Sequence, residues 1–387
     1  MIKKKIAILG STGSIGKSLL NIVNKNLDKV DIVLLTTNTN YKELFKQAKK
    51  YGVKNLIISK KSHFNLAKLN NNNNFNLYNN FNGFKKIFKK KIQYTINAIS
   101  GIDGLEPTLK IIKHTKTIAI ANKEAIICGW NLIKKKLKKN KTFFIPIDSE
   151  HFSIWFALNS YNSNEIEKIY ITASGGPFHD LSFEKFKKAT IKEALNHPNW
   201  SMGKKITIDS ATMINKVFEV IEANKIFNIS YNKIRILIHK DSYVHAVLKF
   251  KNGMIKIIAH DTTMEIPIFN SLNFINLKSI SSNEIDLKKL SNLNFQNLDN
   301  QKFKIKDIIQ ELPKKNSLFE TVLVSANDEL VKLFLDNKIF LSDINKYLLN
   351  FLKLNEFKQY KKIEPSTLSD ILKLKNYVSN KIKNKFL

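Results

Sequence analysis

A chain of 387 residues is too long for one small module, so we expect two or three domains, each with its own core. Hydrophobic residues make up 43% and charged residues 25% of the chain, as in globular proteins. This length and composition exclude a peptide or a disulfide-stapled scaffold. Cys128 is the only cysteine, so an intrachain disulfide and a cysteine-based zinc site are excluded. Together with a start at Met1 that lacks a signal-peptide pattern, this predicts a cytoplasmic protein.

The net charge of +32 raises the question of nucleic-acid binding. Arg235 is the only arginine, however, and a protein that binds DNA or RNA is expected to keep arginine for bidentate contacts. The excess of Lys, Asn, Ile and Phe instead indicates drift in an AT-rich genome. We therefore expect no nucleic-acid partner, and no membrane partner because no apolar run approaches the roughly 18 residues of a membrane span.

Glycine is scarce, with 12 in the chain, yet Gly10, Gly13 and Gly16 fall within seven residues. They follow the apolar stretch Lys5–Leu9 and precede a helical pattern, so they predict a βαβ unit whose turn binds a dinucleotide pyrophosphate. A plain strand-to-helix turn is the alternative. No Asp or Glu lies within Thr36–Asn40 to bind the 2′-hydroxyl of NAD, which favours NADP.

The hydrophobic pattern divides the chain into parts. Residues 1–147 alternate strands and helices and predict a Rossmann-like doubly wound parallel sheet. Residues 148–273 read as an α+β catalytic domain, 274–299 as a linker, and 300–387 as a C-terminal helical bundle. The run Asn70–Asn74 is a low-complexity loop. The predicted strands are Lys5–Leu9, Asp31–Leu35, Asn55–Ser59, Tyr94–Ile99, Thr117–Ala121, Thr142–Ile147, Lys168–Thr172, Ile234–Ile238, His245–Phe250 and Met254–Ala259.

Two acidic residues follow a predicted strand. Asp148 and Glu150 are two positions apart, and in an extended chain they would share a face and could bind a hard divalent cation with a third acidic ligand. A pair of solvated loop acids is the alternative.

A second group of polar residues falls on a predicted helix. There Asn215, Lys216 and Glu219 would share a face, which suits a phosphate beside a metal, although an exposed Lys–Glu pair would give the same spacing. Ser174, followed by Gly175 and Gly176, predicts an anion-binding turn.

Six segments together resemble the 1-deoxy-D-xylulose 5-phosphate reductoisomerase family, in its order and spacing. Weaker similarity continues through Asn327 into the C-terminal helices. The segments are Gly10–Gly16, Ala121–Ala125, Asp148–His151, Ser174–Phe178, His197–Gly203 and Asp209–Met213, the last followed by Asn215, Lys216 and Glu219.

The resemblance implies an NADPH-dependent oxidoreductase and isomerase that requires Mn²⁺, Mg²⁺ or Co²⁺ and is a homodimer. It would convert 1-deoxy-D-xylulose 5-phosphate, a small phosphorylated sugar, to 2-C-methyl-D-erythritol 4-phosphate for isoprenoid precursors. The implied metal ligands are Asp148, Glu150 and Glu219, which with Lys123 form the catalytic set. The implied substrate-binding residues are Lys123, Ser149, Glu150, Ser174, His197, Ser210, Asn215, Lys216 and Glu219. The implied NADPH-binding residues are Thr12, Gly13, Ser14, Ile15, Asn40, Asn122, Glu124 and Gly203. Trp200 and Met202 would belong to a lid over the substrate, in the segment from about Gly176 to Met202.

The sequence departs from the family pattern at two places. The family has Gly-Lys-Asn where this chain has Asn38-Thr39-Asn40, and Pro-Asp-Met-Arg where it has Thr262–Glu265. Two other functions stay open. One is another Rossmann-type NAD(P)-dependent oxidoreductase, such as an aldehyde or semialdehyde dehydrogenase, although Cys128 lies in no recognisable nucleophile motif. The other is a basic binding protein that has lost catalysis.

Overall fold

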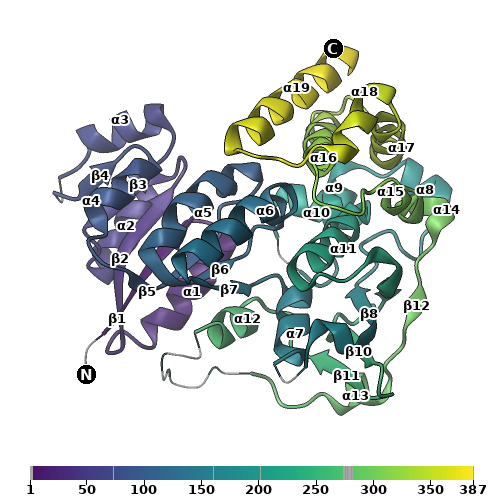
Figure 1. Cartoon of the computed structure of the whole chain (residues 1–387), viewed down its shortest axis with the longest axis horizontal. Coiled ribbons are helices and arrows are strands. Elements are labelled where there is room, and N and C mark those ends of the chain that lie inside the picture. Colours follow the sequence, from purple (N-terminus) through teal and green to yellow (C-terminus); the bar gives the residue numbers. More distant parts are fainter. Residues whose placement is uncertain are drawn as a thin grey trace. The chain divides into compact units, whose positions relative to one another are not determined.

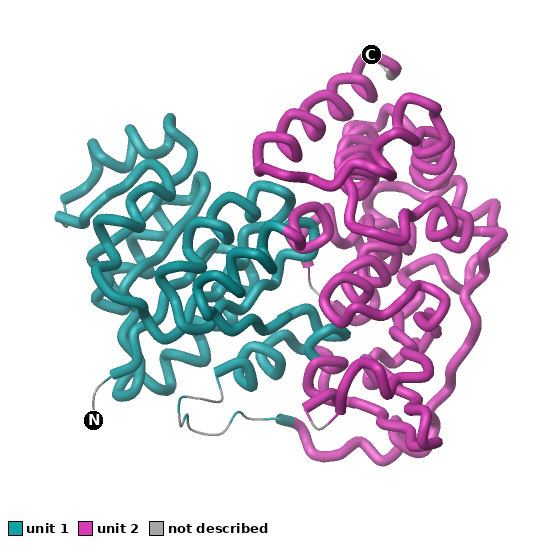
Figure 2. The backbone as a smooth tube through the Cα atoms, viewed as in Figure 1, with its two compact units in different colours: residues 1–125, 132–152, 263–282 teal, residues 126–131, 153–262, 283–387 magenta. Residues whose placement is uncertain are grey.

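The computed structural model describes residues 3–72, 74–159, 161–200, 202–272, 275, 277, 280 and 282–386. The chain divides into two compact units, coloured separately in Figure 2. Unit 1 comprises residues 1–125, 132–152 and 263–282, and unit 2 comprises residues 126–131, 153–262 and 283–387. Among the described residues, no helix is both long and apolar enough to cross a membrane.

Unit 1 is built on a parallel sheet in the order β4-β3-β2-β1-β5-β6-β7. The chain proceeds outward from β1 to β4 and then returns to the other side of β1 with β5. Because parallel crossovers are right-handed, this reversal puts the helices of the two halves on opposite faces. The strands are β1 Lys4–Leu9, β2 Val30–Thr37, β3 Asn55–Ile58, β4 Asn76–Tyr78, β5 Ile92–Asn97, β6 Thr115–Ile120 and β7 Phe143–Pro146.

Helices connect the strands of unit 1 (Figure 1). Asn40 caps α2 by accepting a hydrogen bond from Glu43 N, and Gly52 ends the helix with a φ of 66°. The helices are α1 Ser14–Asn24, α2 Tyr41–Tyr51, α3 Lys61–Leu69, α4 Phe84–Ile87, α5 Leu105–Ile111, α6 Lys123–Asn140 and α12 Glu265–Asn270, with 3-10 turns at Phe81–Gly83, Ile102–Gly104 and Ile112–His114. The predicted doubly wound sheet is confirmed.

Two segments of unit 1 show that it is not one continuous stretch of chain. Helix α12 comes late in the sequence yet packs against α1. Helix α6 begins and ends in unit 1, whereas its middle turn, Ile126–Asn131, belongs to unit 2 and contains a kink at Gly129.

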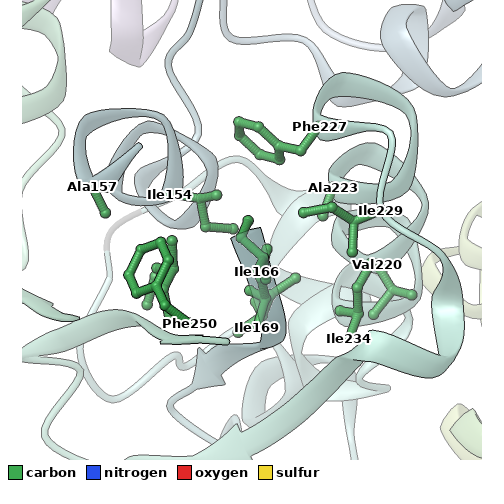
Figure 3. Packing of buried hydrophobic residues seen from close by; sticks show 13 residues of the cluster. Ile154, Ala157, Ile166, Ile169, Val220, Ala223, Phe227, Ile229, Ile234 and Phe250 are labelled. Carbon is green, nitrogen blue, oxygen red and sulfur yellow. The ribbon is translucent and has the colours of Figure 1, made fainter. Parts of the chain in front are cut away.

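Unit 2 contains a mixed sheet in the order β11-β10-β8-β9-β12. Strand β8 pairs in parallel with β9 and antiparallel with β10. Figure 3 shows the core on this sheet, where Ile166, Ile169 and Phe250 meet apolar side chains of α7 and α11 such as Ile154 and Val220. The strands are β8 Ile166–Ala173, β9 Ile234–Ile238, β10 Val244–Phe250, β11 Ile255–Ala259 and β12 Gln296–Asn297.

The rest of unit 2 is helical. Helix α16 packs against α17 and α19, in agreement with the helical periodicity of residues 300–387. The helices are α7 Ser149–Ala157, which starts in unit 1, α8 Phe183–Lys187, α9 Ile191–Ala194, α10 Lys204–Ala211, α11 Ile214–Phe227, α13 Leu287–Ser291, α14 Asn300–Phe303, α15 Ile305–Gln310, α16 Phe319–Leu335, α17 Leu341–Leu352, α18 Asn355–Lys358 and α19 Leu368–Phe386, with 3-10 turns at Ser163–Glu165, Tyr231–Lys233 and Gln359–Lys362.

The segment 274–299, expected to be a linker, includes α13 and the edge strand β12, which pairs with β9. The two compact units are defined by which residues pack together, whereas the three predicted domains are defined by the pattern of strands and helices in the sequence. The domain boundaries at 147, 273 and 299 stay a prediction.

Candidate active site

The glycine turn joins β1 to α1 in unit 1. Gly10 has a φ of 83°, and a Cβ there would lie 2.9 Å from the carbonyl oxygen of Ala98. A Cβ on Gly16 would lie 2.5 Å from the carbonyl oxygen of Gly10, so both positions require glycine. Gly13 is the N-cap of α1 and, among the described residues, no side chain caps the helix. The first-turn N–H groups can therefore bind an anion. The predicted cofactor residues Thr12, Gly13, Ser14 and Ile15 all lie at this end of α1.

Two threonines at the end of β2 support the turn. Thr36 accepts a hydrogen bond from Gly10 N through Oγ1 at 2.9 Å, and the hydroxyl groups of Thr12 and Thr37 lie 2.8 Å apart. Both Thr36 and Thr37 are buried, so the Thr37 hydroxyl supports the turn instead of facing a ligand. Sequence reasoning missed the role of Thr36. Its signal is a hydroxyl side chain at the carboxyl end of the strand next to the glycine turn.

The Asn122-Lys123-Glu124 segment begins α6. The side chain of Asn122 bonds to the backbone, since Oδ1 accepts from Ala125 N at 2.8 Å and Nδ2 donates to the carbonyls of Ile99 and Gly101. Lys123 is buried, and its Nζ lies 3.2 Å from Oδ1 of Asp148. Asn122 thus fixes the start of the helix that presents Lys123.

Asp148 lies between β7 and α7. Its backbone carbonyl accepts the first helical hydrogen bond from Phe152 N at 2.7 Å, so Glu150 already belongs to the helix. The expectation that Asp148 and Glu150 share a face of an extended chain is therefore wrong. The two carboxylates lie around a helix start, where the positive end of the helix dipole favours negative charge.

His151 and Ser149 hold these carboxylates. His151 is fully buried, and its Nδ1 lies 3.0 Å from Oδ2 of Asp148. Because an ionised carboxylate only accepts hydrogen bonds, the proton lies on Nδ1. The Ser149 hydroxyl donates to Oε2 of Glu150 at 2.6 Å. Sequence reasoning gave no role to His151, although a position three residues after Asp148 in a helix is a signal for this contact.

In unit 2, His197 brings two predicted substrate residues together. Its Nε2 lies 3.2 Å from Oγ of Ser174 and 3.0 Å from Oγ of Ser210. Its Nδ1 accepts from the backbone N–H groups of Asn199 and Trp200, so the hydrogen of the neutral ring lies on Nε2. Burial, together with the charge of Lys216, lowers the pKa of His197 to about 4. The ring is therefore neutral at physiological pH and donates to a serine.

The turn after Ser174 packs closely against α10. Gly175 and Gly176 have φ angles of 86° and 68°, and a Cβ on Gly176 would lie 2.8 Å from the carbonyl oxygen of Ser210. Gly176 N donates to Oγ of Ser174 at 3.2 Å. Both glycines are thus required for the backbone to follow this path.

The predicted face of α11 is confirmed. Glu219 accepts hydrogen bonds from the Asn215 amide and from Lys216 Nζ, the latter at 2.5 Å. Lys216 and Glu219 are both buried, which excludes the alternative of an exposed Lys–Glu pair. Met213, with a φ of 63°, separates α10 from α11 and directs this face. A non-glycine residue in this conformation is strained, as is common near functional sites.

Of the two predicted lid residues, Trp200 lies beside His197, to whose Nδ1 its backbone N–H donates. The ring of Trp200 meets that of His245 edge to face at 6.3 Å between centroids, and Asn199 Nδ2 donates to Lys240 O at 2.6 Å and Ser242 Oγ at 2.8 Å. Met202 is half-buried, and Gly203 is the N-cap of α10. Gly203 therefore belongs to unit 2, whereas the other predicted cofactor residues belong to unit 1.

Models of 1-deoxy-D-xylulose 5-phosphate reductoisomerase match residues 6–129, and models of its C-terminal domains match residues 144–227 and 261–381. A 1-deoxy-D-xylulose 5-phosphate reductoisomerase of Pelagibacter ubique (strain HTCC1062) is 56% identical over 382 residues, which are 98% of each chain. This chain belongs to the 1-deoxy-D-xylulose 5-phosphate reductoisomerase family. The resemblance drawn from six motifs is therefore confirmed, and with it the predicted class of enzyme.

Solved structures agree with this family assignment. A reductoisomerase from Zymomonas mobilis in complex with NADPH is 31% identical, with a TM-score of 0.87 and 98% of each chain covered. A DOX-P reductoisomerase in complex with NADPH, fosmidomycin and magnesium is 30% identical, with a TM-score of 0.91, covering 99% of this chain and 98% of that chain. The fold of the family thus extends over the whole chain.

Proposed function

We propose that this chain catalyses the NADPH-dependent rearrangement and reduction of 1-deoxy-D-xylulose 5-phosphate to 2-C-methyl-D-erythritol 4-phosphate. Family membership supports this activity. The observation that carries it is the cluster in unit 2, where His197 joins Ser174 and Ser210 next to the charge of Lys216. These donors suit the phosphate group of a small sugar.

NADPH is the proposed reductant, and two solved relatives are in complex with it. The glycine turn fits this cofactor because Gly10 and Gly16 let the backbone approach a pyrophosphate and the uncapped start of α1 faces it. The proposed contacts are Thr12, Gly13, Ser14, Ile15, Asn40, Asn122, Glu124 and Gly203. When bound, NADPH supplies the hydride. The backbone contacts of Asn122 already fix the start of α6, so its proposed contact to NADPH would add to them.

A divalent cation is the proposed second cofactor, with Asp148, Glu150 and Glu219 as ligands. Three carboxylates suit Mg²⁺ or Mn²⁺, which prefer oxygen ligands, and a solved relative is in complex with magnesium. When bound, the cation stabilises negative charge on the substrate oxygens. Lys123 and His151 orient Asp148 through its two carboxylate oxygens, and Lys123 adds a positive charge beside it. Orientation of ligands by such neighbours is typical of metal sites.

The residues of unit 2 would hold the phosphorylated end of the substrate. Ser174, Ser210, Asn215 and Lys216 are the proposed phosphate contacts, and the neutral His197 ring donates from Nε2 toward the two serines. Because Nδ1 is occupied by two backbone N–H groups, His197 keeps this orientation and does not act as a proton acceptor on that side. Trp200 and Met202 would cover the bound substrate and exclude water.

A homodimer in the cytoplasm is proposed as well. Strand β11 lies at the edge of the sheet of unit 2, and its Ile255 and Ile257 are 55% and 47% exposed, as is 58% of Met254 just before the strand. Phe156 of α7 is also exposed. Apolar side chains on an edge strand favour self-association. Light scattering should give the mass of a dimer, and Ile257→Lys should shift it toward the monomer. Cys128 is buried and is the single cysteine of the sequence, which supports a reducing compartment.

The activity is tested by NADPH oxidation with 1-deoxy-D-xylulose 5-phosphate, with and without Mn²⁺, in a metal-depleted sample. Turnover that requires both the sugar phosphate and the metal is expected. A different Rossmann-type oxidoreductase would leave NADPH unchanged with this substrate, and a chain that had lost catalysis would be inactive while still binding NADPH.

A further inference from the structure

Lys302 of α14 is a lysine whose ammonium group lies inside unit 2. Only 7% of the residue is exposed. Nζ donates to the backbone carbonyls of Phe178, His179 and Leu181, at 3.2 Å for His179. Since an ammonium group has three N–H donors, one turn of the chain uses all of them. Burial lowers the pKa of Lys302, and the nearby carboxylates of Asp299 and Asp180 oppose this shift.

The turn that Lys302 holds is continuous with the proposed phosphate site. It follows Ser174 and the two glycines, of which Gly176 packs against α10, and it leads into the predicted lid segment. The ring of Phe178 lies 5.7 Å from that of Phe186, and Phe186 in turn lies 5.3 Å from Phe303, the neighbour of Lys302. Both aromatic packing and hydrogen bonds thus join this turn to α14.

Helix α14 is fixed from its other side. Asp299 caps it by accepting from Lys302 N at 3.1 Å. The amide of Asn345 on α17 donates to the carbonyl of Phe303 at 2.6 Å and to that of Thr212 at 2.8 Å. Thr212 is the C-cap of α10, two residues after Ser210. Asn345 therefore ties the support of Lys302 to the helix that carries Ser210.

We propose that Lys302 is a positioning residue for the phosphate site: its ammonium group holds the 178–181 turn against α14, which Asn345 ties to α10, and so keeps Ser174, His197 and Ser210 within hydrogen-bond distance. Lys302 does not touch the substrate. It has this role only if Ser174 and Ser210 bind the phosphate as proposed above. A lysine this buried is uncommon unless its ammonium group is paired, and here the partners are backbone carbonyls next to the site.

The test compares Lys302→Met with the parent enzyme. Three buried carbonyls lose their donor, so the KM for 1-deoxy-D-xylulose 5-phosphate should rise about tenfold, which corresponds to about 1.4 kcal/mol. The KM for NADPH should change less than about twofold, because the glycine turn belongs to unit 1. Lys302→Arg keeps the charge and several N–H donors and should restore most of the loss. Lys306→Met removes one exposed lysine from the adjacent helix α15 and is the matched control. It should leave both KM values unchanged.

A double-mutant cycle with Ser210→Ala separates the possible failures. If Lys302 acts through the phosphate site, Lys302→Met should raise the substrate KM clearly less in the Ser210→Ala background than in the parent. An equal rise in both backgrounds, or an unchanged KM in Lys302→Met while Ser210→Ala raises it, would overturn the role of Lys302. An unchanged KM in Ser210→Ala would instead overturn the proposed phosphate site. If Lys302→Met fails to fold, Lys302→Gln, which retains an N–H donor, takes its place with the same expected pattern.

Discussion

The glycine turn of unit 1 and the His197 cluster of unit 2 are both expected to bind phosphate groups, but they are built in different ways. The first uses backbone N–H groups, and its shape depends on the absence of Cβ atoms at Gly10 and Gly16. The second uses side chains, Ser174, His197 and Ser210, that come from three separate segments. A backbone site is therefore contained in one short stretch of sequence, whereas a side-chain site depends on how distant segments pack.

Substitution of the proposed metal ligands should have the largest effect on activity, because it should abolish catalysis without weakening NADPH binding. Asp148→Asn or Glu219→Gln should lower kcat by more than the roughly 10- to 100-fold loss typical of residues that only support a metal ligand. The Kd for NADPH, measured by fluorescence titration, should stay unchanged because the glycine turn keeps all its contacts. Near-normal activity of either variant at limiting Mn²⁺ would contradict the three-carboxylate site.

The backbone character of the glycine turn can be tested with two alanine variants. Gly16→Ala places a Cβ against backbone atoms that cannot rotate away, so the free energy of unfolding should fall by about 1–3 kcal/mol and NADPH should bind more weakly. Gly13→Ala is the matched control, because its Cβ would make an ordinary contact at 3.5 Å and its φ is −81°. Denaturant unfolding of both variants decides the point, and equal losses would contradict the steric argument.

Trp200 of the predicted lid tests whether the His197 cluster depends on the packing of neighbouring side chains. Trp200→Ala removes the ring that contacts His245 and should lower kcat/KM about tenfold, with a higher KM and a lower kcat together. Trp200→Phe keeps an aromatic ring and should retain most of the activity. Steady-state kinetics with both variants give the answer, and an unchanged kcat/KM in Trp200→Ala would remove the lid role.

A smaller effect is expected two residues after β2, where Thr39 stands in place of the family lysine. A hydrogen bond to the 2′-phosphate from a charged group is worth about 1.5–3 kcal/mol, so the enzyme should prefer NADPH by a narrower margin than a Gly-Lys-Asn enzyme. Thr37 is poorly placed to replace that contact, because it is buried and its hydroxyl already pairs with that of Thr12. Thr39→Lys should widen the ratio of kcat/KM values for NADPH and NADH, and no change would place the 2′-phosphate elsewhere.

The smallest effect concerns pH. The pKa of His197 is lowered to about 4 from its ordinary value of 6.5. As pH falls, His197 therefore binds a proton in the unfolded chain at a higher pH than it does in the folded protein. The stability contributed by the neutral ring is therefore complete above pH 6.5 and decreases as pH falls toward 4. The free energy of unfolding, measured from pH 7.5 to pH 5, should fall more steeply for the parent than for His197→Gln. Parallel curves would mean that the folded ring titrates normally.

The sequence predicted those parts of the molecule that depend on local patterns. The glycine spacing, the alternation of strands and helices in unit 1, and the shared face of Asn215, Lys216 and Glu219 are all properties of residues close in the chain. The geometry around Asp148 was predicted wrongly because an acidic residue after a strand can either extend it or begin a helix. The carbonyl of Asp148 accepts from Phe152 N and so begins α7.

Contacts between distant segments could not be predicted. The hydroxyl of Thr36 indicates a contact with Gly10 only once the order of the strands is known. Nothing in the sequence pairs the ammonium group of Lys302 with carbonyls more than a hundred residues earlier. The polar pattern does not indicate that Lys302 is buried, because lysine is abundant in this sequence and is usually exposed in proteins. Burial of such a residue is decided by packing alone.

The discontinuity of unit 1 has a consequence for the synthesis of the protein. Helix α1 leaves the ribosome early, whereas α12, which packs against it, begins at Glu265, about 110 residues after the preceding segment of unit 1 ends at Phe152. At translation rates of about 5–20 residues per second, synthesis of the intervening segment alone takes roughly 5–20 s, and this side of α1 stays uncovered throughout it. During that interval the nascent chain carries a nearly finished nucleotide-binding sheet with one apolar helix surface open to chaperones. Shortening the intervening segment, or slowing its translation, would change how long that surface is available.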